Sequence, residues 1–177
     1  MGCCFSKAPK DIVVCGNSNA GKTTLIRRLV HPNNDFPVLE SAPTIGIHSE
    51  STSIQNVSFN LLDMSGAKPF RFHWRQYFPN ASIIVFVIDA SDYDNLQESL
   101  GILREHVLQV ESSKSRPLLI LANKNDIKGS LSADQISRHL SQMVSSSSLE
   151  REYLIVSSSG KTGNGLSDII KFMLKHP

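Results

Sequence analysis

Nearly continuous apolar runs recur along the chain, and each run has the length of a single strand. They cover residues 11–15, 57–63, 82–89, 117–123 and 153–158. In the middle runs Ile, Val, Leu and Phe follow one another without alternating polar residues, which is typical of strands buried on both faces. The pattern therefore predicts a parallel sheet that lies between layers of helices.

Segments with helical spacing separate these runs. In one of them Leu96, Leu100, Leu103 and Val107 recur every three or four residues, which places them on one face of a helix. Strands that alternate with such segments indicate a doubly wound α/β fold. The predicted helices cover residues 22–30, 95–110, 133–143 and 165–174.

A short turn between residues 46–55 and 57–63 modifies this picture. Short turns join antiparallel strands, whereas parallel strands need a long crossover. The 177 residues suit one domain with a real hydrophobic core. We therefore predict a six-stranded, mostly parallel sheet with one antiparallel edge strand and helices on both faces, within a single domain over residues 11–177.

The composition narrows the classes of protein to consider. Apolar residues make up 40% of the chain, which is typical of a globular protein and not of a disordered one. The formal net charge of +2 is too small to indicate nucleic-acid binding. No apolar run approaches the roughly 18 residues of a membrane-spanning helix. The chain has three cysteines, Cys3, Cys4 and Cys15, an odd number whose spacing is not that of a zinc site. This cysteine usage fits a reducing environment. Cys15 is predicted to be a buried, inert thiol.

The strongest chemical signal follows the first predicted strand. GNSNAGKTT, residues 16–24, fits the pattern G-x-x-x-x-G-K-[ST] and opens a helix. Glycines let the backbone turn its N–H groups towards a polyphosphate, and the helix N-terminus adds the positive end of its dipole. Lys22 is expected to reach the β- and γ-phosphates, and Thr23 to bind Mg²⁺. The predicted nucleotide-binding residues here are Gly16, Asn17, Ser18, Asn19, Ala20, Gly21, Lys22, Thr23 and Thr24.

Two further strand ends supply polar groups. Asp63 ends the run LLD, where a carboxylate can hold Mg²⁺ through a water, and the backbone N–H of Gly66 can approach the γ-phosphate closely. The run LLILANKND ends with Asn123, Lys124 and Asp126. A carboxylate accepts both the ring N–H and the exocyclic amine of guanine, a donor pair that adenine lacks. Asp126 therefore predicts a preference for guanine.

Together these residues resemble the Ras-type small GTPases, and more narrowly their Arf/Arl branch, over nearly the whole chain. PTIG, residues 43–46, resembles the switch I motif, which implies that Thr44 caps the γ-phosphate and ligates Mg²⁺. LDMSGAKPFRFHWRQYF, residues 62–78, resembles switch II. The resemblance implies the small G-protein fold, GTP and GDP as ligands, and Mg²⁺ as cofactor. It also implies that the guanine is flanked by Ser159, Gly160 and Lys161. The Gly160 N–H would then lie near guanine O6.

Switch II departs from the family pattern at the position of the catalytic glutamine. The family reads Asp-x-Gly-Gly-Gln, whereas residues 63–67 read DMSGA, so Ala67 replaces the glutamine. Alanine has no polar atom to orient a water, and one lost polar group in a catalytic site costs on the order of 10²–10³ in rate. We therefore predict a weak GTPase with Thr44 and Gly66 as its remaining catalytic groups. The alternative is a GTP-locked pseudo-GTPase scaffold that recruits partners without turnover.

Aromatic residues accompany switch II. About half of the set Phe70, Phe72, Trp74 and Phe78 is expected to face the core, and the others to form an exposed patch for effectors. Exchange factors and activators are expected at the same switch regions of a monomeric protein that binds no nucleic acid. A phosphate-loop nucleotide kinase is a third alternative, but it predicts an Arg-rich lid that the sequence does not show.

The N-terminus carries a candidate membrane anchor. MGCCFS fits M-G-x-x-x-[ST], the N-myristoylation pattern on Gly2, and Cys3 and Cys4 are candidates for palmitoylation. One myristoyl chain binds membranes only marginally, so a second acyl chain would make anchoring stable. Residues 1–10 are therefore predicted to form a short acylated tail. We expect a protein of vesicle or membrane trafficking on the cytoplasmic face of a membrane (Golgi, endosome or plasma membrane), exchanging with the cytosol.

Overall fold

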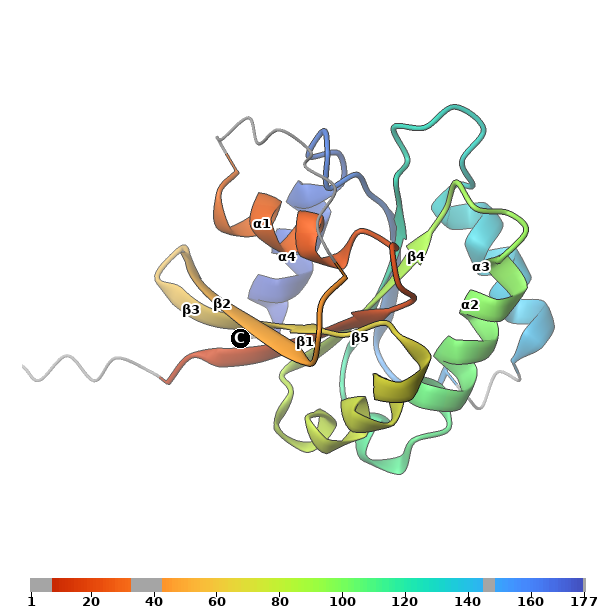
Figure 1. Cartoon of the computed structure of the whole chain (residues 1–177). Coiled ribbons are helices and arrows are strands. Elements are labelled where there is room, and N and C mark those ends of the chain that lie inside the picture. Colours follow the sequence, from red (N-terminus) through yellow and green to blue (C-terminus); the bar gives the residue numbers. More distant parts are fainter. Residues whose placement is uncertain (1–7, 33–42, 145–148, 177) are drawn as a thin grey trace, which may run out of the picture.

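A six-stranded sheet in the order β2-β3-β1-β4-β5-β6 forms the centre of the protein (Figure 1). This computed structural model describes residues 8–32, 43–144 and 149–176. β2 and β3 pair in antiparallel orientation, and the other neighbouring strands pair in parallel. The predicted doubly wound sheet with one antiparallel edge strand is therefore confirmed. The strands are β1 (Lys10–Gly16), β2 (Ile47–Ile54), β3 (Val57–Met64), β4 (Ile83–Asp89), β5 (Leu118–Asn123) and β6 (Tyr153–Ser157).

Helices cover both faces of the sheet (Figure 1). α1 (Lys22–Val30) and α4 (Leu166–Lys175) pack on one face, while α2 (Leu96–Leu103) and α3 (Ala133–Met143) pack on the other. α3 begins with a capping box, in which the Ser132 hydroxyl and the Gln135 side chain satisfy each other's backbone N–H groups. In the part of the chain that the structure describes, no helix is both long and apolar enough to span a bilayer.

Each face of the sheet has its own apolar core, because successive strand residues point to opposite sides. Ile12 and Val14 join the core under α1 and α4, whereas Val13 and Cys15 join the core under α2 and α3. Both faces are apolar, which explains the continuous runs in the sequence. Burial raises the pKa of the Cys15 thiol to about 12, so the group stays protonated and unreactive near neutral pH, as predicted.

The β2–β3 hairpin brings switch I to the end of β3. Its turn residues, Gln55 and Asn56, have φ values of 49° and 65°, as a type I′ turn requires. This tight turn fixes a register in which His48 lies opposite Asp63. The chain that leads into β2 therefore arrives beside the carboxyl end of β3.

The helix predicted over residues 95–110 is only partly an α-helix. α2 ends at Leu103, and the chain continues as a π-helical turn over Arg104–Leu108. The adjacent residues Val107 and Leu108 are both buried in the same core. The buried face of α2 therefore continues through this turn.

The switch II aromatics divide between core and surface, as predicted. Trp74 and Phe78 are fully buried, while Phe70 is 37% exposed and Phe72 is 50% exposed. The segment is not a long α-helix: two 3-10 helices carry these residues, namely η1 (Lys68–Gln76) and η2 (Phe78–Asn80).

Phe78→Ala should lower the free energy of unfolding by about 3–5 kcal/mol, because it deletes a fully buried ring. Phe72→Ala is the matched control: it removes a half-exposed ring and should change the same quantity by no more than about 1 kcal/mol. Urea denaturation of both variants beside the wild type measures the difference. Equal losses in the two variants would contradict the division of the aromatics.

Candidate nucleotide site

The carboxyl ends of the parallel strands meet at one edge of the sheet, where a cavity of ≈ 620 Å³ opens. Most of the predicted nucleotide-binding residues line it: Ser18, Asn19, Gly21, Lys22, Thr23, Thr24, Thr44, Gly66, Asn123, Lys124, Asp126, Gly160 and Lys161. The others lie just behind the wall and hydrogen-bond to residues that line it: Gly16, Asn17, Ala20, Asp63 and Ser159.

The phosphate loop, residues 16–23, closes around its own lysine. Lys22 Nζ donates to the carbonyls of Gly16 (3.1 Å) and Asn17 (2.7 Å), which holds the ammonium against the loop. Burial lowers the pKa of Lys22, and the charge of the nearby Asp63 carboxylate opposes that shift. Asn19 has a φ of 60°, an uncommon value for a residue with a side chain. The loop is therefore a preformed cradle with its cation already positioned.

Three oxygen-bearing side chains converge beside the phosphate loop. Thr23 Oγ1 donates to Asp63 Oδ2 (2.5 Å) and lies 3.2 Å from Thr44 Oγ1, which is 3.4 Å from the same Asp63 oxygen. Asp63 is only 1% exposed, and burial raises the pKa of its carboxyl although hydrogen bonds from Thr23 and Thr44 lower it. Among the described residues, no group hydrogen-bonds to the buried Asp63 Oδ1. A cluster of oxygen ligands that includes one carboxylate oxygen without a hydrogen-bond partner fits Mg²⁺. The residues predicted to hold the metal therefore do come together.

Asn123 joins the phosphate loop to the loops at the other end of the cavity. Its Nδ2 donates to the Ala20 carbonyl (2.8 Å), and its Oδ1 accepts from the Gly160 N–H (3.1 Å). The Gly160 N–H, which the resemblance implies lies near guanine O6, thus hydrogen-bonds to Asn123 in this structure. Ser159 Oγ donates to Asp126 Oδ1 (2.6 Å), which orients the carboxylate predicted to recognise guanine.

Two residues that sequence reasoning missed support this end of the cavity. Arg28 of α1 donates from Nε to the Gly160 carbonyl (3.2 Å) and from Nη2 to the Lys161 carbonyl (2.7 Å). Asp89 pairs with Lys124 across 2.6 Å between Oδ2 and Nζ. The position of Asp89 at a strand end was a usable signal. Nothing in the sequence connects Arg28 with a residue 132 positions away.

Ser65 connects the two switch regions through its backbone. Its N–H donates to the Gly46 carbonyl (2.9 Å), which ties switch II to the end of switch I. Its carbonyl accepts from Trp74 Nε1 (2.9 Å), so the buried indole N–H also satisfies the backbone oxygen of Ser65, the residue that connects the two switch regions.

Gly66 lies directly on the phosphate loop. A Cβ at this position would be 2.5 Å from the backbone nitrogen of Ser18 and 2.5 Å from the carbonyl carbon of Asn17, a distance that side chains do not tolerate. Ala67 follows at the wall of the cavity. Its side chain offers only a methyl group at the position where the family pattern has glutamine.

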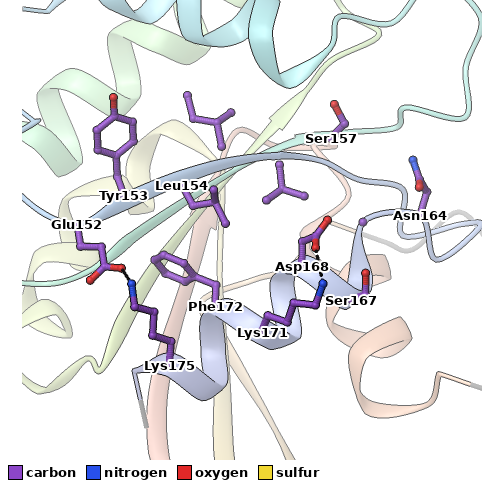
Figure 2. A pocket seen from close by; sticks show the side chains of 13 residues that line it. Glu152, Tyr153, Leu154, Ser157, Asn164, Ser167, Asp168, Lys171, Phe172 and Lys175 are labelled. Atoms are coloured by element: carbon purple, nitrogen blue, oxygen red, sulfur yellow. Dashed lines mark hydrogen bonds and ion pairs between the residues drawn. The ribbon is translucent and has the colours of Figure 1, made fainter.

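A second cavity, ≈ 690 Å³, lies between β6 and α4 (Figure 2). It is the larger of the two, but none of the predicted binding residues lines it. Its charged side chains pair with one another, Lys171 with Asp168 and Lys175 with Glu152. The cavity at the sheet edge is therefore the better candidate for a phosphate-bearing ligand.

The sheet order, the phosphate loop after β1 and the two switch segments together define the fold of a small GTPase. The family model "ADP-ribosylation factor family" matches residues 4–176, which is nearly the whole chain. The chain therefore belongs to the ADP-ribosylation factor (Arf) family.

Relatives and a solved structure agree with this assignment. ADP-ribosylation factor-like protein 3 of Chlamydomonas reinhardtii is 35% identical over 164 residues, which cover 93% of this chain and 88% of the relative. The small COPII coat GTPase SAR1B of Dictyostelium discoideum is 40% identical over 126 residues, 71% of this chain and 62% of the relative. The structure of the Arl6 BBS3 small GTPase from Trypanosoma brucei, with the nucleotide analogue GppNp bound, matches at a TM-score of 0.79 and 27% identity, covering 95% of this chain and 96% of that chain.

Asp63→Asn should weaken the binding of a non-hydrolysable GTP analogue in Mg²⁺ by about tenfold or more, because a carboxylate that fits the metal is lost. In EDTA the wild type and the variant should bind the analogue more nearly alike. Titration calorimetry under both conditions measures the effect, with Asp168→Asn as the control because Asp168 lies on the exposed side of α4. A variant that responds to Mg²⁺ as strongly as the wild type does would contradict the metal assignment.

Proposed function

We propose that this chain is an Arf-like GTP-binding switch that is anchored to a membrane and hydrolyses GTP slowly. The observation that carries the proposal is the cavity at the sheet edge, which gathers the phosphate loop, the oxygen cluster and the guanine motif around one space. A guanine nucleotide with Mg²⁺ is a ligand whose parts match all three groups. GTP and GDP are accordingly the proposed ligands.

In this proposal each motif holds one part of the nucleotide. Lys22 reaches the β- and γ-phosphates from within the phosphate loop. Thr23 and Thr44 would ligate Mg²⁺ and Asp63 would hold it through a water; the chemistry that a bound Mg²⁺ supplies is neutralisation of charge on phosphate oxygens. At the other end Asp126 accepts from the two N–H donors of guanine, with its carboxylate oriented by Ser159.

The proposed switch acts through the two segments that meet at Ser65. GTP would order switch I through Thr44 and switch II through Gly66. Exposed apolar side chains lie on both segments, with Ile45 87% exposed and Phe72 50% exposed, and they support a surface for effectors. Exchange factors and activators are proposed to bind the same regions of a monomer.

Slow hydrolysis is proposed from the side chain at position 67. In the family pattern a glutamine holds the attacking water, and here a methyl group stands at that wall of the cavity. Of the charged residues nearby, Lys68 is exposed, and Arg71 is engaged by the backbone carbonyl of Gly66 and the side chain of Asn17. We propose that these contacts keep Arg71 from taking over the role of the glutamine.

A GTP-locked scaffold without turnover is the second candidate, and the same methyl group supports it. The two candidates differ only in whether the bound triphosphate is ever cleaved. A nucleotide kinase is not proposed, because the chain belongs to the Arf family.

A role in vesicle or membrane trafficking is proposed from the relatives, one of which is named as a coat GTPase. The anchor is proposed from the sequence of the N-terminus, in which Gly2 would carry myristate and Cys3 and Cys4 palmitate. These residues lie outside the part of the chain that the structure describes. The proposed location is the cytoplasmic face of a membrane, in exchange with the cytosol.

Purified wild-type protein should contain GTP or GDP, and single-turnover hydrolysis of loaded GTP should be very slow. Ala67→Gln should raise that rate by about 10²-fold or more, because it restores a polar group that can orient the water. Chromatography of the nucleotide over time measures both quantities, with the exposed Ala8→Gln as the control. GTP that stays intact in both the wild type and Ala67→Gln would favour the scaffold, and rapid hydrolysis by the wild type would refute both readings.

Gly2→Ala should move most of the protein from the membrane fraction to the cytosol, because it removes the acceptor of the first acyl chain. The double variant Cys3→Ser and Cys4→Ser should also shift towards the cytosol while it keeps the myristate. Cys15→Ala is the matched cysteine control, since Cys15 is fully buried and cannot be acylated in the folded protein. Fractionation with mass spectrometry of the N-terminal peptide is the measurement, and a Gly2→Ala protein that stays on membranes would rule out the anchor.

A further inference from the structure

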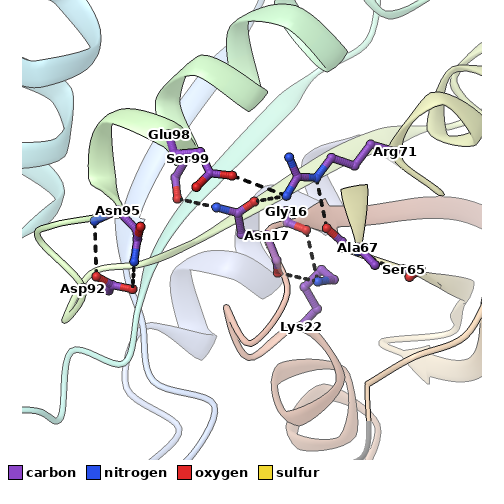
Figure 3. Close-up of polar contacts among 11 residues, drawn as sticks. Gly16, Asn17, Lys22, Ser65, Ala67, Arg71, Asp92, Asn95, Glu98 and Ser99 are labelled. Carbon is purple, nitrogen blue, oxygen red and sulfur yellow. Dashed lines mark hydrogen bonds and ion pairs between the residues drawn. The ribbon is translucent and has the colours of Figure 1, made fainter. Parts of the chain in front are cut away.

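Arg71 of η1 is a largely buried cation of switch II. Its side chain is only 11% exposed. Nε donates to the Gly66 carbonyl (3.0 Å), and Nη2 donates to Asn17 Oδ1 (2.9 Å) (Figure 3). Nη2 also lies 3.6 Å from Glu98, whose side chain is 58% exposed. The guanidinium therefore makes one hydrogen bond within switch II, to Gly66, and one to the phosphate loop, to Asn17, and adds a weaker ion pair to α2.

The Asn17 amide is the acceptor that makes this link specific. Its Oδ1 accepts from Arg71, and its Nδ2 donates to Ser99 Oγ of α2 (3.0 Å) (Figure 3). Ser99 is buried, so this second bond fixes which way the amide faces. The Asn17 backbone carbonyl meanwhile accepts from Lys22 Nζ. One residue thus contributes its main chain to the phosphate loop and its side chain to switch II and α2.

The same bonds hold Gly66 where it contacts the phosphate loop. The carbonyl that accepts the hydrogen bond from Arg71 Nε is that of Gly66. The Cα of Gly66 packs so closely against Asn17 and Ser18 that a Cβ would not fit. A hydrogen bond to a charged group contributes more than one between neutral groups, and it contributes most when both partners are shielded from water. Hydrogen bonds between protein groups therefore stabilise the contact between switch II and the phosphate loop, with Gly66 bound on the one side and Asn17 on the other.

We propose that Arg71, Asn17 and Ser99 form a clamp that holds Gly66 against the phosphate loop, and that this clamp favours the triphosphate over the diphosphate. The clamp joins protein groups only, so it promotes the closed position of switch II whichever nucleotide is bound. Only a ligand with a γ-phosphate uses the Gly66 N–H in that position, and only its affinity benefits. Arg71 is then a positioning residue, and the inference rests on the proposed binding of guanine nucleotides.

Two positive charges beside the phosphate loop also favour the triphosphate over the diphosphate. Arg71 and Lys22 are two cations held by neighbouring groups of the phosphate loop, the carbonyl and the side chain of Asn17. A ligand with one more phosphate gains more from two nearby cations than a diphosphate does. A chain without the hydrolytic glutamine that also favours the triphosphate would remain in the GTP state for long periods.

The test compares the affinities of the full chain for GDP and for a non-hydrolysable GTP analogue in Mg²⁺. Arg71→Lys keeps the charge but cannot make both hydrogen bonds, and it should lower the affinity for the analogue by about tenfold while the affinity for GDP changes less than about twofold. Asn17→Leu should act in the same direction, and the double variant should lose little more than the larger single loss. Ser99→Ala removes only the bond that orients the Asn17 amide and keeps the bond between Arg71 and Asn17, so it should give a smaller loss of the same kind.

Glu98→Gln is the matched control, because it removes only the exposed ion pair of Arg71 and should leave both affinities unchanged. Equal losses for GDP and the analogue in Arg71→Lys, or no loss for either, would overturn the clamp while the proposed function stands. Losses that simply add in the double variant would do the same. A wild type that binds neither nucleotide would overturn the proposed function and the clamp together.

Discussion

The parallel alignment of β1, β3, β4, β5 and β6 is the constraint on which the site depends. It makes the phosphate loop, Asp63, Asn123 and the last loop leave the sheet at the same edge, although they are far apart in the sequence. Two apolar layers stabilise that alignment, one under α1 and α4 and one under α2 and α3. The central strands β4 and β5 are apolar along almost their whole length, so their polar groups gather where they end.

Gathering charges at a buried edge has an electrostatic cost. Burial shifts Lys22 and Asp63 in opposite directions, lowering the pKa of the lysine and raising that of the carboxyl, and both shifts favour the neutral form. Their mutual attraction offsets only part of this cost. A divalent cation beside Asp63 and a polyphosphate beside Lys22 would remove most of the remainder, so ligand binding and folding stability are expected to be coupled.

The sequence was sufficient for the sheet, the phosphate loop and Asp63, because each of them follows from a local pattern, whereas the place of Thr44 in the oxygen cluster was implied by the family resemblance. Continuous apolar runs predicted strands buried on both faces, and the strand ends predicted where the polar residues would meet. The hydrogen bonds of Arg28, Arg71 and Asn17 could not be predicted in this way, since they join side chains to distant loops. The π-helical turn after α2 was also missed, because apolar spacing does not distinguish a regular helix from one with a wider turn.

The only tryptophan of the chain, Trp74, hydrogen-bonds to Ser65, the residue that connects switch I with switch II. Trp74 is fully buried, with its indole N–H on the Ser65 carbonyl and its ring near Phe86 and His106. Any movement of switch II away from the phosphate loop would change the surroundings of that ring and no other indole. The intrinsic fluorescence of this protein is therefore a built-in optical reporter of its switch, and no external label is needed to follow the transition in real time.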